Sequence, residues 1–190
     1  SSAASDVYKR QYQTMLSMAQ LLVKRLEPAC ERIEIVGSLR REKDLIGDIE
    51  LIAIPKDQKD LFGQPATGLP NEVEKLIGEW PVILEKNGPK WKRLVVSAKN
   101  HDPFTVDLFL VPAAEWGVAK LIRTGSKEFS HKMVTLQSQG GFMPDGFQIG
   151  SKTLKVTNRV FSYGTMLNTP SEKDVFTLWG MDYVEPKDRS

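Results

Sequence analysis

A glycine-serine turn followed by two acids within an apolar run is the feature that most constrains this chain. The segment 32–55 has one apolar run, breaks at Gly37 and Ser38, and resumes as a second apolar run that contains Asp48 and Glu50. Alternate residues of a strand point to the same face, so we expect both carboxylates on one face and the apolar side chains on the other. Paired carboxylates on a rigid face suit hard cations, which prefer oxygen ligands. The segment therefore predicts a metal site on a strand.

The turn that precedes the acids can bind an anion through its backbone N–H groups, especially where it opens a helix. The turn and the acids lie within about 14 residues of each other, a spacing that a strand, a turn and a returning strand can close. Taken separately, such features are usually structural: a plain turn and a solvated strand edge. Their combination is what indicates a site for a phosphate-bearing ligand and a metal.

This combination resembles the nucleotidyltransferase signature, in the form found in family X DNA polymerases, the DNA polymerase beta group. Two later segments strengthen the resemblance: one is similar to a helix that ends in a threonine-glycine-serine turn beside the incoming nucleotide, and the other to the family's C-terminal tail. The resemblance covers the chain from about residue 32 to its end. The motifs that carry it are Gly37-Ser38, Arg40-Arg41, Gly47-Asp48-Ile49-Glu50, the segment 116–126 with Phe129, and the segments 171–176 and 183–189.

The family pattern requires a third carboxylate on a later strand, and Asp107 is the one acid in the apolar run 104–112. Alternation places it on the opposite face from Val106. A lone carboxylate in a buried strand costs free energy unless it is paired, hydrogen-bonded or bound to metal, so its presence favours function. With Asp48 and Glu50 it makes a triad suited to two divalent ions, which can clamp the attacking and leaving oxygens of an in-line displacement.

The resemblance implies an α/β (α+β) fold in two parts. Residues 1–111 are expected to form a nucleotidyltransferase palm with a mixed sheet and an N-terminal helix, and residues 112–190 a small α+β thumb that binds the nascent base pair. This is the minimal palm-plus-thumb form of the small viral members, without an amino-terminal lyase domain. The implied enzyme is a monomeric DNA polymerase that adds dNTPs to the primer 3′ end of gapped DNA in repair, with two Mg²⁺ ions, or Mn²⁺ in their place.

The resemblance also assigns roles to single residues. Asp48, Glu50 and Asp107 would hold the metals, and Asp107 would help to activate the primer 3′ hydroxyl. Glu50 replaces the commoner aspartate, and Ile122 with Arg123 replaces an aromatic pair beside the sugar, which leaves metal geometry and sugar discrimination open. The nucleotide-binding residues that it implies are Gly37, Ser38, Arg40, Arg41, Gly47, Thr124, Gly125, Ser126, Phe129 and Ser130.

Basic residues gather on a predicted hairpin and in a predicted helix, where they could contact a nucleic-acid backbone. A hairpin edge guarded by lysines and a solvated helix face explain them equally well. The candidates are Lys90 and Lys92 beside Trp91 on the hairpin, and Lys127, His131 and Lys132 in the helix.

Composition sets broad limits. With 26 basic and 24 acidic residues, a net charge of +2 does not by itself indicate nucleic-acid binding. No apolar run has transmembrane length and no leader is evident, so we expect no membrane partner and an intracellular protein at the site of DNA. The single cysteine, Cys30, excludes an internal disulfide. Residues 1–5 are expected to be a disordered end, residues 6 to about 30 an amphipathic helix, residues 56–70 a loop, and a short helix is expected from Asn71.

Two other functions stay open. One keeps the fold but changes the acceptor: a template-independent nucleotidyltransferase that acts on DNA or RNA ends or on another molecule. The other is a catalytically silent nucleic-acid-binding module whose acids no longer bind metal. The first differs from a polymerase in whether the added base follows a template, and the second in lacking Mg²⁺-dependent nucleotide binding.

Overall fold

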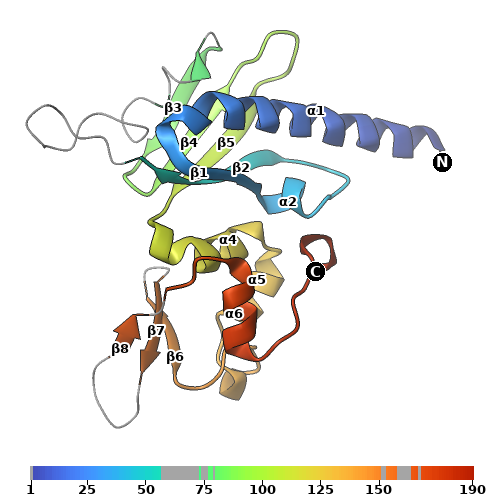
Figure 1. The fold of residues 1–190 in the computed structure, drawn as a ribbon. Coiled ribbons are helices and arrows are strands. Elements are labelled where there is room, and N and C mark those ends of the chain that lie inside the picture. Colours follow the sequence, from blue (N-terminus) through green and yellow to red (C-terminus); the bar gives the residue numbers. More distant parts are fainter. Residues whose placement is uncertain are drawn as a thin grey trace, which may run out of the picture. The chain divides into compact units, whose positions relative to one another are not determined.

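The computed structural model describes residues 2–56, 73, 77–78, 80–150, 153–157, 164–166 and 168–190. The chain forms two compact units, Ser1–Val111 (unit 1) and Pro112–Ser190 (unit 2), whose elements Figure 1 labels. The loop expected at 56–70 and most of the helix expected from Asn71 lie outside the described residues. None of the described helices combines the length and the apolar character needed to span a membrane.

Unit 1 is built on a five-stranded sheet. Its strands are β1 (Cys30–Val36), β2 (Asp48–Pro55), β3 (Val82–Asn87), β4 (Trp91–Val96) and β5 (Phe104–Leu110). The order is β1-β2-β5-β4-β3; β2 and β5 run parallel, and the other neighbours run antiparallel (Figure 1). The predicted α/β class with a mixed sheet is therefore confirmed.

Helix α1 (Ser2–Leu26) supplies the apolar layer on one side of this sheet. Leu22 and Leu26 of α1 are buried in the same core as Ile49 of β2 and Leu108 of β5. The helix begins earlier than predicted, because the residues expected to be a disordered end are helical from Ser2. Alanine is the strongest helix former, and Ala3 and Ala4 follow directly, which accounts for the earlier start.

The single cysteine lies where α1 has ended, after the short 3₁₀ turn Glu27–Ala29. The Cys30 thiol is buried and donates a hydrogen bond to the Leu26 carbonyl at 3.2 Å. Burial raises the pKa of this thiol to about 11. Because a thiol with such a pKa is protonated at neutral pH, Cys30 is a packing residue and not a nucleophile.

Unit 2 combines three helices with a small sheet. They are α4 (Trp116–Thr124), α5 (Lys127–Met133), α6 (Glu172–Trp179), and the antiparallel strands β6 (Phe147–Gly150), β7 (Thr153–Thr157) and β8 (Gly164–Met166). A separate apolar core joins Leu121, Phe129 and Phe176 of the three helices. A reciprocal capping box begins α6: the backbone N–H of Ser171 donates to the Asp174 carboxylate, and the backbone N–H of Asp174 donates to the Ser171 hydroxyl.

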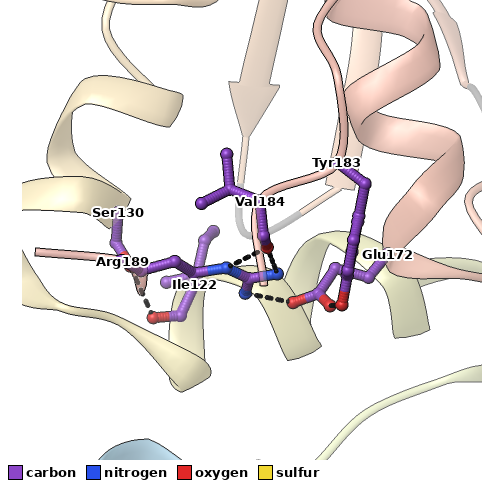
Figure 2. A network of polar contacts seen from close by, with 6 residues as sticks. All are labelled: Ile122, Ser130, Glu172, Tyr183, Val184 and Arg189. Atoms are coloured by element: carbon purple, nitrogen blue, oxygen red, sulfur yellow. Dashed lines mark hydrogen bonds and ion pairs between the residues drawn. The ribbon is translucent and has the colours of Figure 1, made fainter. Parts of the chain in front are cut away.

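The C-terminal tail is held to unit 2 by a buried arginine. Arg189 is fully buried, and its Nη1 donates to Glu172 Oε1 at 2.6 Å while Nε and Nη2 donate to the Val184 carbonyl at 3.0 and 2.9 Å (Figure 2). Its guanidinium also lies 5.4 Å from the centre of the Phe129 ring and 5.5 Å from that of Tyr183. These contacts satisfy a charge that would otherwise be costly to bury.

Candidate active site

The register of two parallel strands brings the three predicted acids to one face of the unit 1 sheet. Glu50 of β2 lies opposite Asp107 of β5, and Asp48 precedes Glu50 by two residues. Ile49 and Leu51, which alternate with the acids, are fully buried in the core. The carboxylates also influence one another, since burial and then the negative charge of Asp107 raise the pKa of Asp48.

Asp107 is only 3% exposed, and three N–H groups donate to it from β4. The guanidinium of Arg93 binds both carboxylate oxygens, with Nε 2.9 Å from Oδ1 and Nη2 2.8 Å from Oδ2. The indole Nε1 of Trp91 donates to Oδ1 at 2.8 Å. The hydrogen bonds to Asp107, and then its negative charge, raise the pKa of Arg93 above its ordinary value. The third acid is therefore held in an ion pair on the sheet.

Glu50 lies against the glycine-serine turn. A Cβ added to Gly37 would lie 1.8 Å from Glu50 Oε2 and 2.7 Å from its Cδ, so the carboxylate occupies the space that a side chain at position 37 would take. Gly37 also has φ +67°, which disfavours residues other than glycine. The turn continues into the four-residue helix α2 (Gly37–Arg40), in which Ser38 and Arg40 are half-buried. Arg41 caps its end.

The donor set suits a hard cation, although the side chains are not gathered around one point. Asp48, Glu50 and Asp107 offer carboxylate oxygens, the ligands that Mg²⁺ prefers. Among the described residues, no group of three or more His, Cys, Asp or Glu side chains is close enough together to hold a metal ion. Coordination of one ion by all three acids therefore requires their side chains to rearrange.

A glutamine on α1 fixes the backbone that leads into the acidic strand. Gln11 Nε2 donates to the Ile46 carbonyl at 2.7 Å, and the Ile46 N–H donates to Gln11 Oε1 at 3.1 Å. Gly47, predicted to bind the nucleotide, comes next and is exposed, with nothing within 4 Å of an added Cβ. The paired hydrogen bonds thus set the direction in which the chain enters β2 at Asp48.

In unit 2 the predicted nucleotide-binding residues form the junction between two helices. Thr124 ends α4, Gly125 caps it with φ 74°, and Ser126 begins α5 by accepting a hydrogen bond from Phe129 N at 3.2 Å. The peptide bond between Gly125 and Ser126 is cis. Phe129 is buried, and Ser130 donates to the Ile122 carbonyl at 2.9 Å (Figure 2). Phe129 and Ser130 therefore make structural contacts within unit 2.

The predicted nucleic-acid-binding residues differ in accessibility. Lys90, Lys127, His131 and Lys132 are exposed. Lys92 is only 2% exposed and its ammonium donates to the Asn87 side chain. Its neighbours on β4, Trp91 and Arg93, point to the opposite face, toward Asp107, so Lys92 faces the core and a contact with a nucleic-acid phosphate is no longer proposed for it.

Sequence reasoning missed Arg93 as a site residue. The sequence does carry a signal: Trp91 and Arg93 are two positions apart on a predicted strand, which places them on one face of it. What it does not carry is the register, which sets Arg93 directly opposite Asp107.

Comparison with known proteins supports the resemblance. Residues 119–190 match the family model described as DNA polymerase beta thumb. DNA polymerase lambda from Rattus norvegicus is 29% identical over 160 residues, which cover 80% of this chain and 28% of that protein. The resemblance to family X DNA polymerases is confirmed.

The region that matches the DNA polymerase beta thumb model begins within α4 and runs to the last residue. It therefore includes the junction at Gly125 and Ser126, the capped helix α6 and the tail held by Arg189. The similarity to a family X polymerase extends over most of this chain, yet the chain spans only about 28% of the length of that relative.

Proposed function

We propose that this chain is a family X DNA polymerase that adds a dNTP to a primer 3′ end, directed by the template of a gap, in DNA repair. The observation that carries the proposal is the parallel register that places Glu50 opposite Asp107, with Asp48 on the same face. The match of residues 119–190 to a DNA polymerase beta thumb supports it.

In the proposed reaction the primer 3′ oxygen attacks the α-phosphorus of the dNTP, the bond to the β-phosphate oxygen breaks, and pyrophosphate leaves. Asp48, Glu50 and Asp107 would hold two Mg²⁺ ions, which supply charge neutralisation at the reacting phosphate when bound. Asp107 would also help to activate the 3′ hydroxyl. The acids lie on a rigid sheet, which suits a reaction that depends on positioning.

The binding roles follow the same proposal. The turn at Gly37 and Ser38, the two arginines after it and the backbone at Gly47 would bind the triphosphate. In unit 2, the junction at Gly125 and Ser126 would lie against the sugar, and the exposed Lys127, His131 and Lys132 would contact DNA. Lys90 on the hairpin is also exposed and is retained as a DNA contact.

One observation favours a second candidate, a nucleic-acid-binding module without catalysis. The described residues contain no ready group of three metal ligands, and Asp107 is already paired with Arg93. If this arrangement persists when nucleotide and metal are present, the chain would bind DNA without extending it.

Primer extension distinguishes these functions. We expect the wild-type protein with Mg²⁺ or Mn²⁺ to incorporate only the nucleotide complementary to a one-nucleotide gap. Asp107→Asn should reduce the rate by about 10³-fold, because it removes a charged ligand without changing the side-chain volume. The melting temperature of this variant should show that the fold is kept.

Asp102→Asn, a change of an exposed acid in the loop before β5, is the matched control and should extend the primer normally. Addition without regard to the template would move the function to the template-independent transferase. An Asp107→Asn protein as active as wild type would contradict the proposed role of the triad.

A further inference from the structure

Asp107 has little acceptor capacity left. A carboxylate offers about four lone-pair positions, and three are taken: two on Oδ1, by Trp91 Nε1 and Arg93 Nε, and one on Oδ2, by Arg93 Nη2. Of the two oxygens of Asp107, only Oδ2 keeps a lone-pair position to which none of the described residues donates. A cation that binds Asp107 in this geometry therefore binds it through Oδ2.

The two donors are themselves held in place by packing. Trp91 and Phe109 are register partners, and their rings stack at 6.5 Å with an angle of 13° between planes. The Arg93 guanidinium lies 5.5 Å from the centre of the Trp91 ring. A bidentate guanidinium–carboxylate pair also fixes both side chains geometrically. The side-chain orientation of Asp107 is thus determined by β4.

The charge of Arg93 faces a strongly acidic surface. Three carboxylates share this face of the sheet, and Arg93 forms an ion pair with one of them, Asp107, at 2.8 Å. The Arg93 side chain is 37% exposed, so solvent can reach it. The positive charge of Arg93 therefore balances the negative charge of Asp107, as a bound metal ion would.

We propose that Arg93 is a positioning residue for Asp107: it balances the acidic face before a metal binds, and it orients Asp107 so that Oδ2 faces the metal. This inference rests on the proposed function, because it takes Asp107 as a metal ligand. It assigns Arg93 two separable effects. Its charge weakens metal binding, since like charges repel. Its two hydrogen bonds to Asp107 maintain the geometry that incorporation needs.

Two substitutions separate charge from geometry. Arg93→Gln removes the positive charge and the bidentate hydrogen bonding to Asp107. Arg93→Lys keeps the charge but loses the bidentate hydrogen bonding. We would measure binding of Mn²⁺ to the nucleotide-free protein, from the loss of the free Mn²⁺ signal in electron paramagnetic resonance. In parallel we would measure single-turnover incorporation on gapped DNA.

We expect Arg93→Gln to bind Mn²⁺ about fivefold more tightly than wild type, and Arg93→Lys to remain within about twofold of wild type. Both should incorporate nucleotide at least about tenfold more slowly, because displacement of a reacting group is costly. Trp91→Phe keeps the ring on Phe109 but loses one uncharged donor, so it should slow incorporation by a few-fold and leave Mn²⁺ affinity unchanged.

Arg32→Gln is the matched control. Arg32 forms an exposed ion pair with Glu34 at 2.8 Å on β1, so the same charge is removed in the same unit away from Asp107. A merely structural role for Arg93 would weaken or preserve Mn²⁺ binding in the Arg93→Gln protein, and either result would overturn the proposal. If wild type incorporates nothing but Arg93→Gln still binds Mn²⁺ more tightly, the polymerase function fails while the positioning of Asp107 against a cation stands.

Discussion

At the scale of single residues, ionisation of the Asp48 carboxyl costs more free energy in the folded protein than in the unfolded chain. Its pKa lies above the ordinary value of 3.8, because of burial first and the charge of Asp107 second; the attraction of Arg93 and a backbone hydrogen bond oppose this rise. A carboxyl with a raised pKa in the folded state binds its proton more tightly there than in the unfolded chain. Its favourable contribution to stability is therefore complete below pH 3.8 and is lost as the pH rises through the raised pKa.

Asp48→Asn should accordingly stabilise the fold at neutral pH while it abolishes incorporation. Asp48 is half-exposed, so solvent screening keeps the gain small, and we expect a rise in melting temperature of about 2 °C at pH 7. The gain should shrink toward pH 3. Thermal unfolding followed by circular dichroism between pH 3 and pH 8 measures it, and a lower melting temperature than wild type at pH 7 would contradict the assignment.

At the scale of elements, the contact between α1 and the start of β2 links the helix to the acidic face. Gln11 replaces a missing backbone partner for Ile46 by donating one hydrogen bond to it and accepting another. Each such bond contributes about 1 kcal/mol, and loss of the side chain leaves two partly buried backbone groups unsatisfied. The position of Asp48 thus depends on a residue far from it in the sequence.

Gln11→Ala should lower the free energy of unfolding by about 2 kcal/mol and increase amide exchange at Ile46. Incorporation should slow by a few-fold. Gln11→Glu keeps the acceptor for the Ile46 N–H and loses the donor, so it should restore part of the protection. Urea unfolding and hydrogen exchange measure these effects. Gln20→Ala, an exposed change on the same helix, serves as the control; equal effects of Gln20→Ala and Gln11→Ala would exclude a specific link.

These elements also show how far sequence reasoning reaches. The period of apolar residues predicts α1, and alternation predicts that Asp48 and Glu50 share one face, because both depend on neighbours along the chain. The pairing of Arg93 with Asp107 depends on the register of β4 on β5, and the place of Glu50 depends on side-chain packing at Gly37. Neither follows from local spacing, so the acids could be predicted but their partners could not.

At the scale of the whole molecule, each unit has its own apolar core. The C-terminal tail depends on the core of unit 2 through Arg189, whose charge is buried with that of Glu172. Removing one member of a buried ion pair is costly because the other charge is left uncompensated. A change at Arg189 should therefore act on one unit before the other.

Arg189→Met should destabilise unit 2 by about 3 kcal/mol or more. Hydrogen exchange followed by mass spectrometry should show lost protection in α4 and α6, with β2 and β5 still protected. Adding Glu172→Gln to Arg189→Met should recover part of the loss, since no unpaired charge then remains. Equal loss of protection in both units would show that they unfold as one.

The contact between Gly37 and Glu50 has a consequence for how this protein can change by mutation. The turn leaves room for the carboxylate of Glu50 only because position 37 has no side chain. Position 37 and position 50 are therefore coupled: a side chain at position 37 would require the Glu50 carboxylate to move, and the positive φ would still have to be relieved. We therefore expect a substitution at position 37 to be tolerated only together with a change in the side chain at position 50.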